Sequence, residues 1–269
     1  MDVAWGPRQR APDFWPIWRR ELKRIKPDIF LLAEASGRDP YYARNGFDAA
    51  YDWTDKLGEW AWQAAFEDET NTASRLRTAI RASAADPETL VFRFLNNNDT
   101  GVRFITRYGL ERTRVATAML FLLPGLPALY TGDEVGATFE PYKTTTPIDW
   151  VDSHDLAAWH TRLITLRRET PALRSQELVL LDASHAERVL VFERPGATPE
   201  QTVLVLLNFS EDPLNVELRP GTSGLFAPGT GSSETVQLMD MLDRENVMTS
   251  GAHPQFRLAP YGVRILQAH

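Results

Sequence analysis

The sequence Ile-Phe-Leu-Leu-Ala-Glu at residues 29–34 decides the fold class. Five consecutive apolar residues are typical of a strand buried on both faces of a parallel sheet, and this run stops abruptly at Glu34. Strands that alternate with helices along the chain predict βαβ units. The elements predicted around this run are helices at 14–25, 109–123 and 156–168, and short strands or apolar runs at 47–53, 90–95 and 128–130.

After Pro171 the pattern changes from strands and helices to short strands alone. Turns rich in Gly and Pro separate them, which predicts a small antiparallel β-sandwich. We therefore predict two domains, an α/β region over residues 1–173 and an all-β region over residues 174–269. The strands predicted in the second region are 177–181, 188–193, 202–208, 214–218, 235–242 and 255–268.

Composition excludes several classes of protein. The 269 residues are 43% hydrophobic and 24% charged, which is ordinary for a globular protein. A net charge of −7 without a basic run disfavours nucleic acid as a partner. The longest apolar segment, 115–130, is interrupted by two prolines and is too short to cross a bilayer, so no membrane partner is expected. As written, the N-terminus has no signal-peptide pattern, which predicts a cytoplasmic protein.

Acidic residues follow three of the predicted strands. They are Glu34, Asp99 and the pair Asp133-Glu134. The carboxyl ends of parallel strands open onto one face, where catalytic groups lie in such folds. A carboxylate that ends so apolar a run has a raised pKa, which suits a proton donor. Glu34 and Asp99 also fit as turn or cap residues, and for Asp133-Glu134 we favour that structural role, with the acids binding loop amides.

Other residues give weaker signals. Most tryptophans fit a packing role, although one beside a catalytic loop, such as Trp5, can stack on a sugar ring. There is no cysteine, the five histidines show no metal-ligand spacing, and no nucleotide-binding motif is present. No metal site and no cofactor are therefore evident.

Three segments, LLAEAS (31–36), FLNNND (94–99) and GLPALYTGDEVG (125–136), occur in this order before the β-sandwich. Their order and spacing resemble the second half of the α-amylase family, glycoside hydrolase family 13, over essentially the whole chain. The resemblance implies a partial (β/α)8 barrel, from the end of strand 4 through helix 8, followed by the antiparallel sandwich.

The resemblance also implies roles for individual residues. Glu34 matches the family's general acid, and Asp99 matches the Asp that stabilises the transition state. Met1-Asp2-Val3-Ala4 matches the last part of the nucleophile motif, so Asp2 is expected to be the nucleophile, the alternative being a frayed terminus. Asn98 stands where the family motif has His. We assign substrate binding to Asn98, Arg103 and Trp5.

The implied activity is retaining hydrolysis of α-glucosidic bonds in starch or maltodextrin, with an α-linked oligo- or polysaccharide of glucose as partner. A closed barrel needs roughly 250 residues. We therefore expect the chain to be a fragment without strands 1 to 4, and any calcium site to lie in that missing half. The open barrel edges should favour self-association. Activity of the chain alone is doubtful. The alternatives are a glucanotransferase or isomerase of the same family, a non-catalytic carbohydrate-binding protein, and a truncated, non-functional chain.

Overall fold

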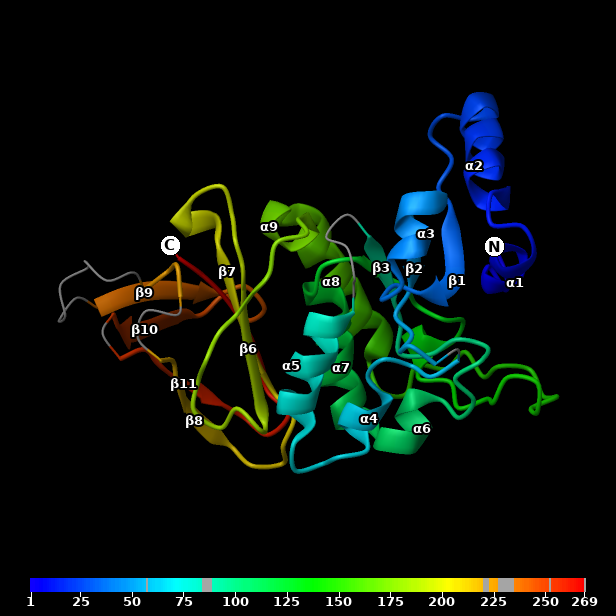
Figure 1. Ribbon diagram of the computed structural model, residues 1–269. Helices are drawn as coiled ribbons and strands as arrows, with labels where there is room; N and C mark the ends of the chain where they lie inside the picture. Colours follow the sequence, from blue (N-terminus) through cyan, green and yellow to red (C-terminus); the bar gives the residue numbers. More distant parts are fainter. Residues whose placement is uncertain (57, 84–88, 220–222, 227–234, 252, 269) are drawn as a thin grey trace.

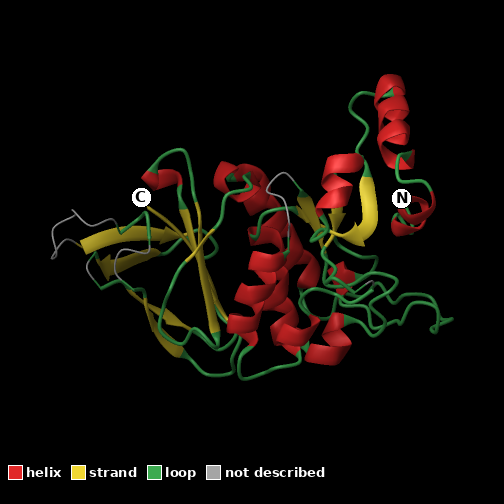
Figure 2. Ribbon diagram, viewed as in Figure 1, coloured by secondary structure: helices red, strands yellow, loops and turns green. Residues whose placement is uncertain are grey.

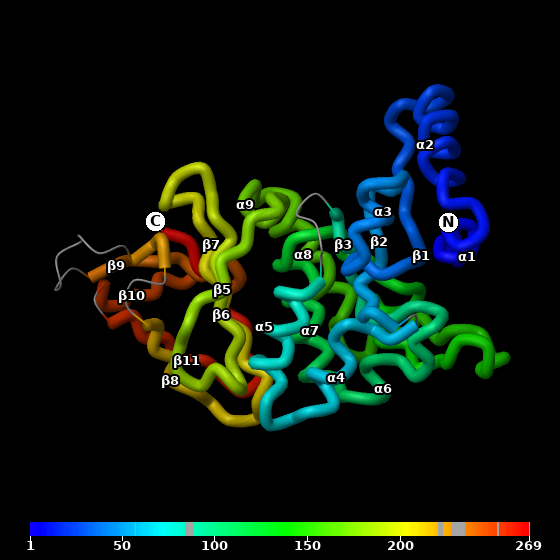
Figure 3. Tube along the Cα trace, viewed as in Figure 1, coloured from blue at the N-terminus to red at the C-terminus, as the bar shows by residue number. Residues whose placement is uncertain are grey.

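A computed structural model describes residues 1–56, 58–83, 89–219, 223–226, 235–251 and 253–268. One end of the molecule is a parallel sheet with its helices, and the other end is built from antiparallel strands (Figures 1 and 2). The trace in Figure 3 runs from one end to the other, with helices α5, α7 and α8 between the two sheets.

The first region alternates strands and helices, as predicted. Its four strands lie in the order β1-β2-β3-β4 and pair in parallel, so each strand lies beside the next one in the sequence. This arrangement is an open segment of a β/α barrel. The elements are α1 (Trp5–Arg10), α2 (Phe14–Ile25), β1 (Leu32–Ser36), α3 (Pro40–Asn45), β2 (Ala49–Tyr51), α4 (Gln63–Phe66), α5 (Thr72–Ala82), β3 (Leu90–Arg93), α6 (Phe104–Tyr108), α7 (Leu110–Leu122), β4 (Leu126–Pro127), the 3-10 turn η1 (Asp133–Val135), α8 (Leu156–Glu169) and α9 (Pro171–Arg174).

Two predicted strands are displaced. Strand β1 begins at Leu32 instead of Ile29, because the carboxylate of Asp48 accepts the Leu31 N–H at 2.9 Å and keeps this residue out of the ladder. Strand β4 is Leu126–Pro127, whereas 128–130 was predicted. The reason is Gly125, at a φ of +100°: a Cβ there would lie 2.4 Å from the Val91 carbonyl, so the chain meets β3 immediately after this glycine.

The second region is the predicted β-sandwich. A six-stranded antiparallel sheet, ordered β10-β9-β12-β7-β6-β5, packs on the two-stranded sheet β11-β8. Its elements are β5 (Val179–Leu180), β6 (Val189–Arg194), η2 (Pro199–Gln201), β7 (Val203–Asn208), β8 (Leu214–Glu217), β9 (Thr235–Asp240), β10 (Asn246–Ser250), β11 (Gln255–Leu258) and β12 (Val263–Ala268).

Two expectations for this region were wrong. The stretch 255–268 is two strands, because the Gly262 N–H bonds the Ala259 carbonyl at 2.9 Å and reverses the chain between them. Strand β10 was not predicted at all. Most of its side chains are exposed at the sheet edge, so it carries little of the apolar signal that marks a buried strand.

One apolar core joins the two regions. Strands β6 and β7 are buried on both faces: one faces the sandwich core and the other faces helices α5 and α7. Helix α7 is therefore buried nearly all round, unlike a surface helix. This core holds the helices in place. The parallel sheet packs against these helices, so the core also positions the carboxyl ends of its strands.

Candidate active site

Glu34 lies near the carboxyl end of β1. Its neighbours Ala33 and Ala35 point to the other face of the strand and are buried in the core beneath α2 and α3, which leaves the Glu34 carboxyl half-buried on the inner face. The N–H of Val3 donates to Glu34 Oε2 at 2.6 Å. The carboxyl group of Asp2 lies beside it and contributes to the raised pKa of Glu34.

The N-terminal residues deliver Asp2 to this position. The Met1 amino group donates to the Leu32 carbonyl at 2.7 Å, and the Glu34 N–H donates to the Met1 carbonyl at 3.0 Å. Met1 thus pairs with β1 as a parallel neighbouring strand would. The buried Trp15 indole then bonds the Ala4 carbonyl at 2.9 Å. These bonds hold Asp2 between two anchored residues, next to Glu34.

Asp99 lies in a tight turn after β3. The buried side-chain oxygen of Asn97 accepts the N–H groups of Asp99, at 2.8 Å, and Thr100, at 3.0 Å. This is the Asx turn that the Asn-rich string predicts. The turn leaves Asp99 and its neighbour Asn98 exposed, so the same residues that form the turn also present the Asp99 carboxylate to solvent.

The three acids form one electrostatic cluster. Burial, the neighbouring Asp2 carboxyl and the negative charge of Asp99 raise the pKa of Glu34 to about 6. The Val3 N–H opposes this effect, since it favours the ionised carboxylate. The structure therefore brings Asp2, Glu34 and Asp99 together, and it gives Glu34 a proton in mildly acidic solution.

Tyr51 is a fourth member of the cluster that the sequence did not single out. It ends β2, is half-buried and stacks on Phe92 with ring centroids 5.2 Å apart. Burial, followed by the charges of Glu34, Asp99 and Asp2, raises the pKa of its phenol. Its position at the end of an apolar run could have indicated that it lies near the acids, because the carboxyl ends of parallel strands share one face.

Asn98 contacts both Asp99 and a distant loop. Its amide nitrogen donates to Asp99 Oδ1 at 3.1 Å and to the Tyr142 hydroxyl at 2.8 Å. The side chain is exposed beside the acids, where a sugar hydroxyl can reach it.

Arg103 lies inside the protein. Its side chain is 1% exposed and donates to Asp133 Oδ1 at 2.6 Å, and its guanidinium packs against the rings of both Tyr130 and Phe139. The Asp133 carboxylate also accepts the Tyr130 N–H at 3.0 Å, in agreement with the structural role favoured for this acid. Arg103 therefore holds the loop after β4 in this structure, and a role for it in substrate binding stays a prediction.

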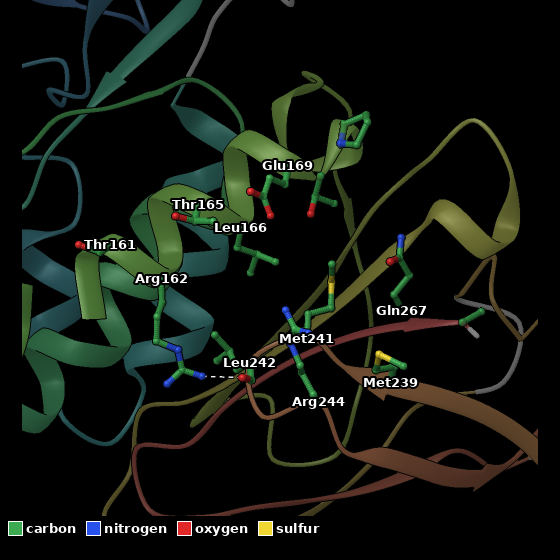
Figure 4. A pocket seen from close by; sticks show the side chains of 13 residues that line it. Thr161, Arg162, Thr165, Leu166, Glu169, Met239, Met241, Leu242, Arg244 and Gln267 are labelled. Atoms are coloured by element: carbon green, nitrogen blue, oxygen red, sulfur yellow. Dashed lines mark hydrogen bonds between the residues drawn. The ribbon is translucent and has the colours of Figure 1, made fainter. Parts of the chain in front are cut away.

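Trp5 lines a cavity of about 870 Å³ at the Glu34 edge of the sheet. The indole is 37% exposed, and the cavity wall includes Ala35 and Ser36, which directly follow Glu34. A second cavity, of about 710 Å³, lies between α8 and strands β9 and β12 (Figure 4). None of the three acids lines either cavity, and we place the site at the parallel sheet because Glu34 and Asp99 lie at the carboxyl ends of its strands.

Neither a metal site nor a membrane span stands out in the part of the chain that the structure describes. Within those residues, no three His, Cys, Asp or Glu side chains are grouped so as to hold a metal ion. No helix among them is long and apolar enough to cross a membrane.

Comparison with known proteins gives a consistent picture. The profile of the alpha-amylase catalytic domain matches residues 3–173. The chain is 31% identical to the alpha-amylase MalA of Haloarcula japonica over 234 residues, which are 83% of this chain and 33% of that protein. It is 26% identical to a cyclomaltodextrinase of Geobacillus thermopakistaniensis, over 81% of this chain and 37% of that one. The chain thus spans about a third of the length of these relatives.

Solved structures agree on the fold. An alpha-amylase from Geobacillus thermoleovorans, solved with acarbose, superposes with a TM-score of 0.75 at 20% identity, over 95% of this chain and 57% of that one. A cyclomaltodextrinase superposes with a TM-score of 0.74, over 96% of this chain and 43% of that one. With the profile match over most of its first region, the chain belongs to the α-amylase family, glycoside hydrolase family 13.

Proposed function

We propose that this chain carries the reacting carboxyl groups of a retaining α-glucoside hydrolase that acts on α-linked glucans such as starch and maltodextrin. The observation that carries the proposal is the cluster of three acids at Glu34, in which burial, the neighbouring Asp2 carboxyl and the charge of Asp99 raise the pKa of Glu34 to about 6. Inverting enzymes hold their two carboxyl groups about 6.5–9.5 Å apart to admit a water molecule between acid and base. We propose the shorter separation of a retaining pair, because the Asp2 carboxyl is near enough to Glu34 to raise its pKa.

In the first step, protonated Glu34 gives its proton to the glycosidic oxygen as the bond to the anomeric carbon breaks. The Asp2 carboxylate attacks that carbon and forms a covalent glycosyl ester, and the shortened glucan leaves as an alcohol. In the second step, ionised Glu34 takes a proton from water, whose oxygen attacks the anomeric carbon and releases Asp2. The Asp99 carboxylate stabilises the positive charge that develops on the sugar in both transition states.

The direct test is to trap the covalent intermediate. Because the chain is expected to lack strands 1 to 4, it is mixed with a separately expressed first half of the barrel and incubated with a fluorinated α-glucosyl fluoride, which slows the second step. The labelled peptide is identified by mass spectrometry. We expect an adduct on Asp2 that is absent in Asp2→Asn and retained in Asp28→Asn, a change in the turn after α2. Glu34→Gln should lower turnover of maltotriose roughly 10²- to 10⁴-fold, the usual contribution of a general acid. An adduct on another residue, or none, would contradict the proposal.

We also propose that the chain self-associates through the open edge of the barrel segment at β1, where α2 packs, with a second copy as the partner. Phe14, Ile17, Ile25 and the following Phe30 are 43–71% exposed. The three helical residues form a stripe beside the buried face of α2. Helix α2 lies at the periphery of the molecule in Figure 1. Sedimentation velocity should show a concentration-dependent dimer that Ile25→Glu weakens and Arg20→Glu does not. A monomer at 100 µM would contradict this.

A further inference from the structure

Tyr142 has an exposed and strained position near the acids. Its side chain is 84% exposed, and its backbone adopts a φ of +66°. A left-handed conformation is unfavourable in free energy for a residue with a Cβ, and it is unusual for a bulky side chain. Burial of the ring returns little of this free energy, because most of the ring faces solvent.

The surrounding turn holds this conformation. The N–H groups of Lys143 and Thr144 donate to the Glu140 carbonyl at 3.2 and 2.9 Å, and the Glu140 N–H donates to the Thr144 hydroxyl at 2.8 Å. An ion pair between Glu140 and Lys143 closes the turn at 2.5 Å. Strain that the surrounding structure maintains in this way is typical of functional sites.

The turn also reaches the Asp99 loop. The Tyr142 hydroxyl accepts the Asn98 amide at 2.8 Å, and the same amide nitrogen contacts Asp99 Oδ1 at 3.1 Å. The loop after β4 thus places an aromatic ring one residue away from the carboxylate assigned to transition-state stabilisation. The ring is exposed, and its hydroxyl contacts Asn98 in the site.

We propose that Tyr142 is a specificity-determining residue, whose ring stacks on a glucosyl unit of the bound α-glucan while its hydroxyl orients Asn98. The C–H face of a pyranose is apolar and matches an exposed phenol ring. This inference rests on the proposed function and adds to it a preference for chains of several glucose units over glucose itself.

The test is calorimetric titration of the full chain with maltotetraose. Tyr142→Gly removes the ring and suits the positive φ, so it should weaken binding about tenfold without lowering the melting temperature. Tyr142→Phe keeps the ring and should bind within about twofold of the original. Tyr261→Gly is the matched control, since Tyr261 also has a positive φ, of 49°, but lies between β11 and β12 in the sandwich. It should leave binding unchanged.

The outcomes separate the two proposals. If Tyr142→Gly binds maltotetraose as tightly as the original chain, the inference is wrong while the proposed function stands. If the original chain binds no maltotetraose and forms no adduct on Asp2, both are wrong. Binding lost equally in Tyr142→Gly and Tyr142→Phe would overturn the stacking role, because the hydroxyl that contacts Asn98, and not the ring, would then matter.

Discussion

Glu34 illustrates how a cluster of acidic side chains lowers the stability of the folded protein. The folded chain raises the pKa of this carboxyl from 4.5 to about 6, so near neutral pH the folded state contains an ion that burial and two neighbouring acids disfavour. Such a group makes the folded state bind the proton more tightly than the unfolded state does. Its ionisation therefore lowers stability as pH rises from about 4.5 to 6.

We predict that Glu34→Gln stabilises the chain at pH 7 and not at pH 4. A shift of this size corresponds to about 2 kcal/mol, which we reduce to about 1 kcal/mol because the carboxyl retains partial contact with solvent. The glutamine oxygen can still accept the Val3 N–H, so the main change is the lost charge. Urea unfolding at both pH values measures the effect, and Glu245→Gln, on the surface of the sandwich, should show no such gain. Equal stability of Glu34→Gln and the original chain at pH 7 would contradict the raised pKa.

Part of this site could be predicted from the sequence. Glu34 and Asp99 follow apolar runs, and the carboxyl ends of parallel strands meet at one edge, so their proximity follows from the topology. The loop after β4 has no comparable rule. Nothing in its sequence shows that it returns to Asn98, or that Arg103 turns inward to Asp133, because such contacts depend on the packing of distant segments.

At the level of the elements, a buried ion pair connects the strands that present the site. Arg93 on β3 donates to Asp52 Oδ2, just after β2, at 2.5 Å. It also donates to the Ser83 hydroxyl, after α5, at 2.9 Å and to the Pro124 carbonyl, before β4, at 2.8 Å. The Asp52 side chain is completely buried, so its carboxylate depends on this guanidinium.

We predict that Arg93→Met costs about 3–5 kcal/mol of unfolding free energy, because it leaves the buried Asp52 charge unpaired. The double variant Arg93→Met with Asp52→Leu should recover at least half of that loss, since both charges are then absent. Arg75→Met is the control, because Arg75 is 53% exposed in its pair with Asp68 and should cost less than about 1 kcal/mol. Urea denaturation measures all four chains. A double variant no more stable than Arg93→Met would show that packing, and not the charge, sets the cost.

The elements that could be predicted best are those whose signal is local. Helix α2 spans residues 14–25 as predicted, because its apolar period is regular and Lys26-Pro27 stops it. Strands β4 and β10 could not be located in this way. The first is set by the approach of Gly125 to β3, and the second is an edge strand with exposed side chains.

At the scale of the whole molecule, the boundary predicted at 173/174 falls within α9, but the packing continues across it. Phe192, Val205 and Leu207 of the sandwich share a core with Val115 and Met119 of α7. The buried Arg194 of β6 donates to the carbonyl groups of Leu122 at the end of α7 and, at 2.6 Å, of Ser175. Two regions with so much shared apolar surface should unfold together.

We therefore predict that the two regions unfold in a single cooperative transition. A substitution in the sandwich can test this, because the unfolding of the first region can be followed separately. All eight tryptophans lie between Trp5 and Trp159, so tryptophan fluorescence reports on the first region alone. Leu207→Ala, at a fully buried position of β7, should cost about 2–5 kcal/mol and shift the fluorescence midpoint in urea as far as the far-UV circular dichroism midpoint. Val179→Ala, at a position 41% exposed, should shift neither. A fluorescence midpoint that stays in place while the dichroism midpoint moves would mean that the sandwich unfolds separately, and that the shared core does not couple it to the sheet carrying the acids.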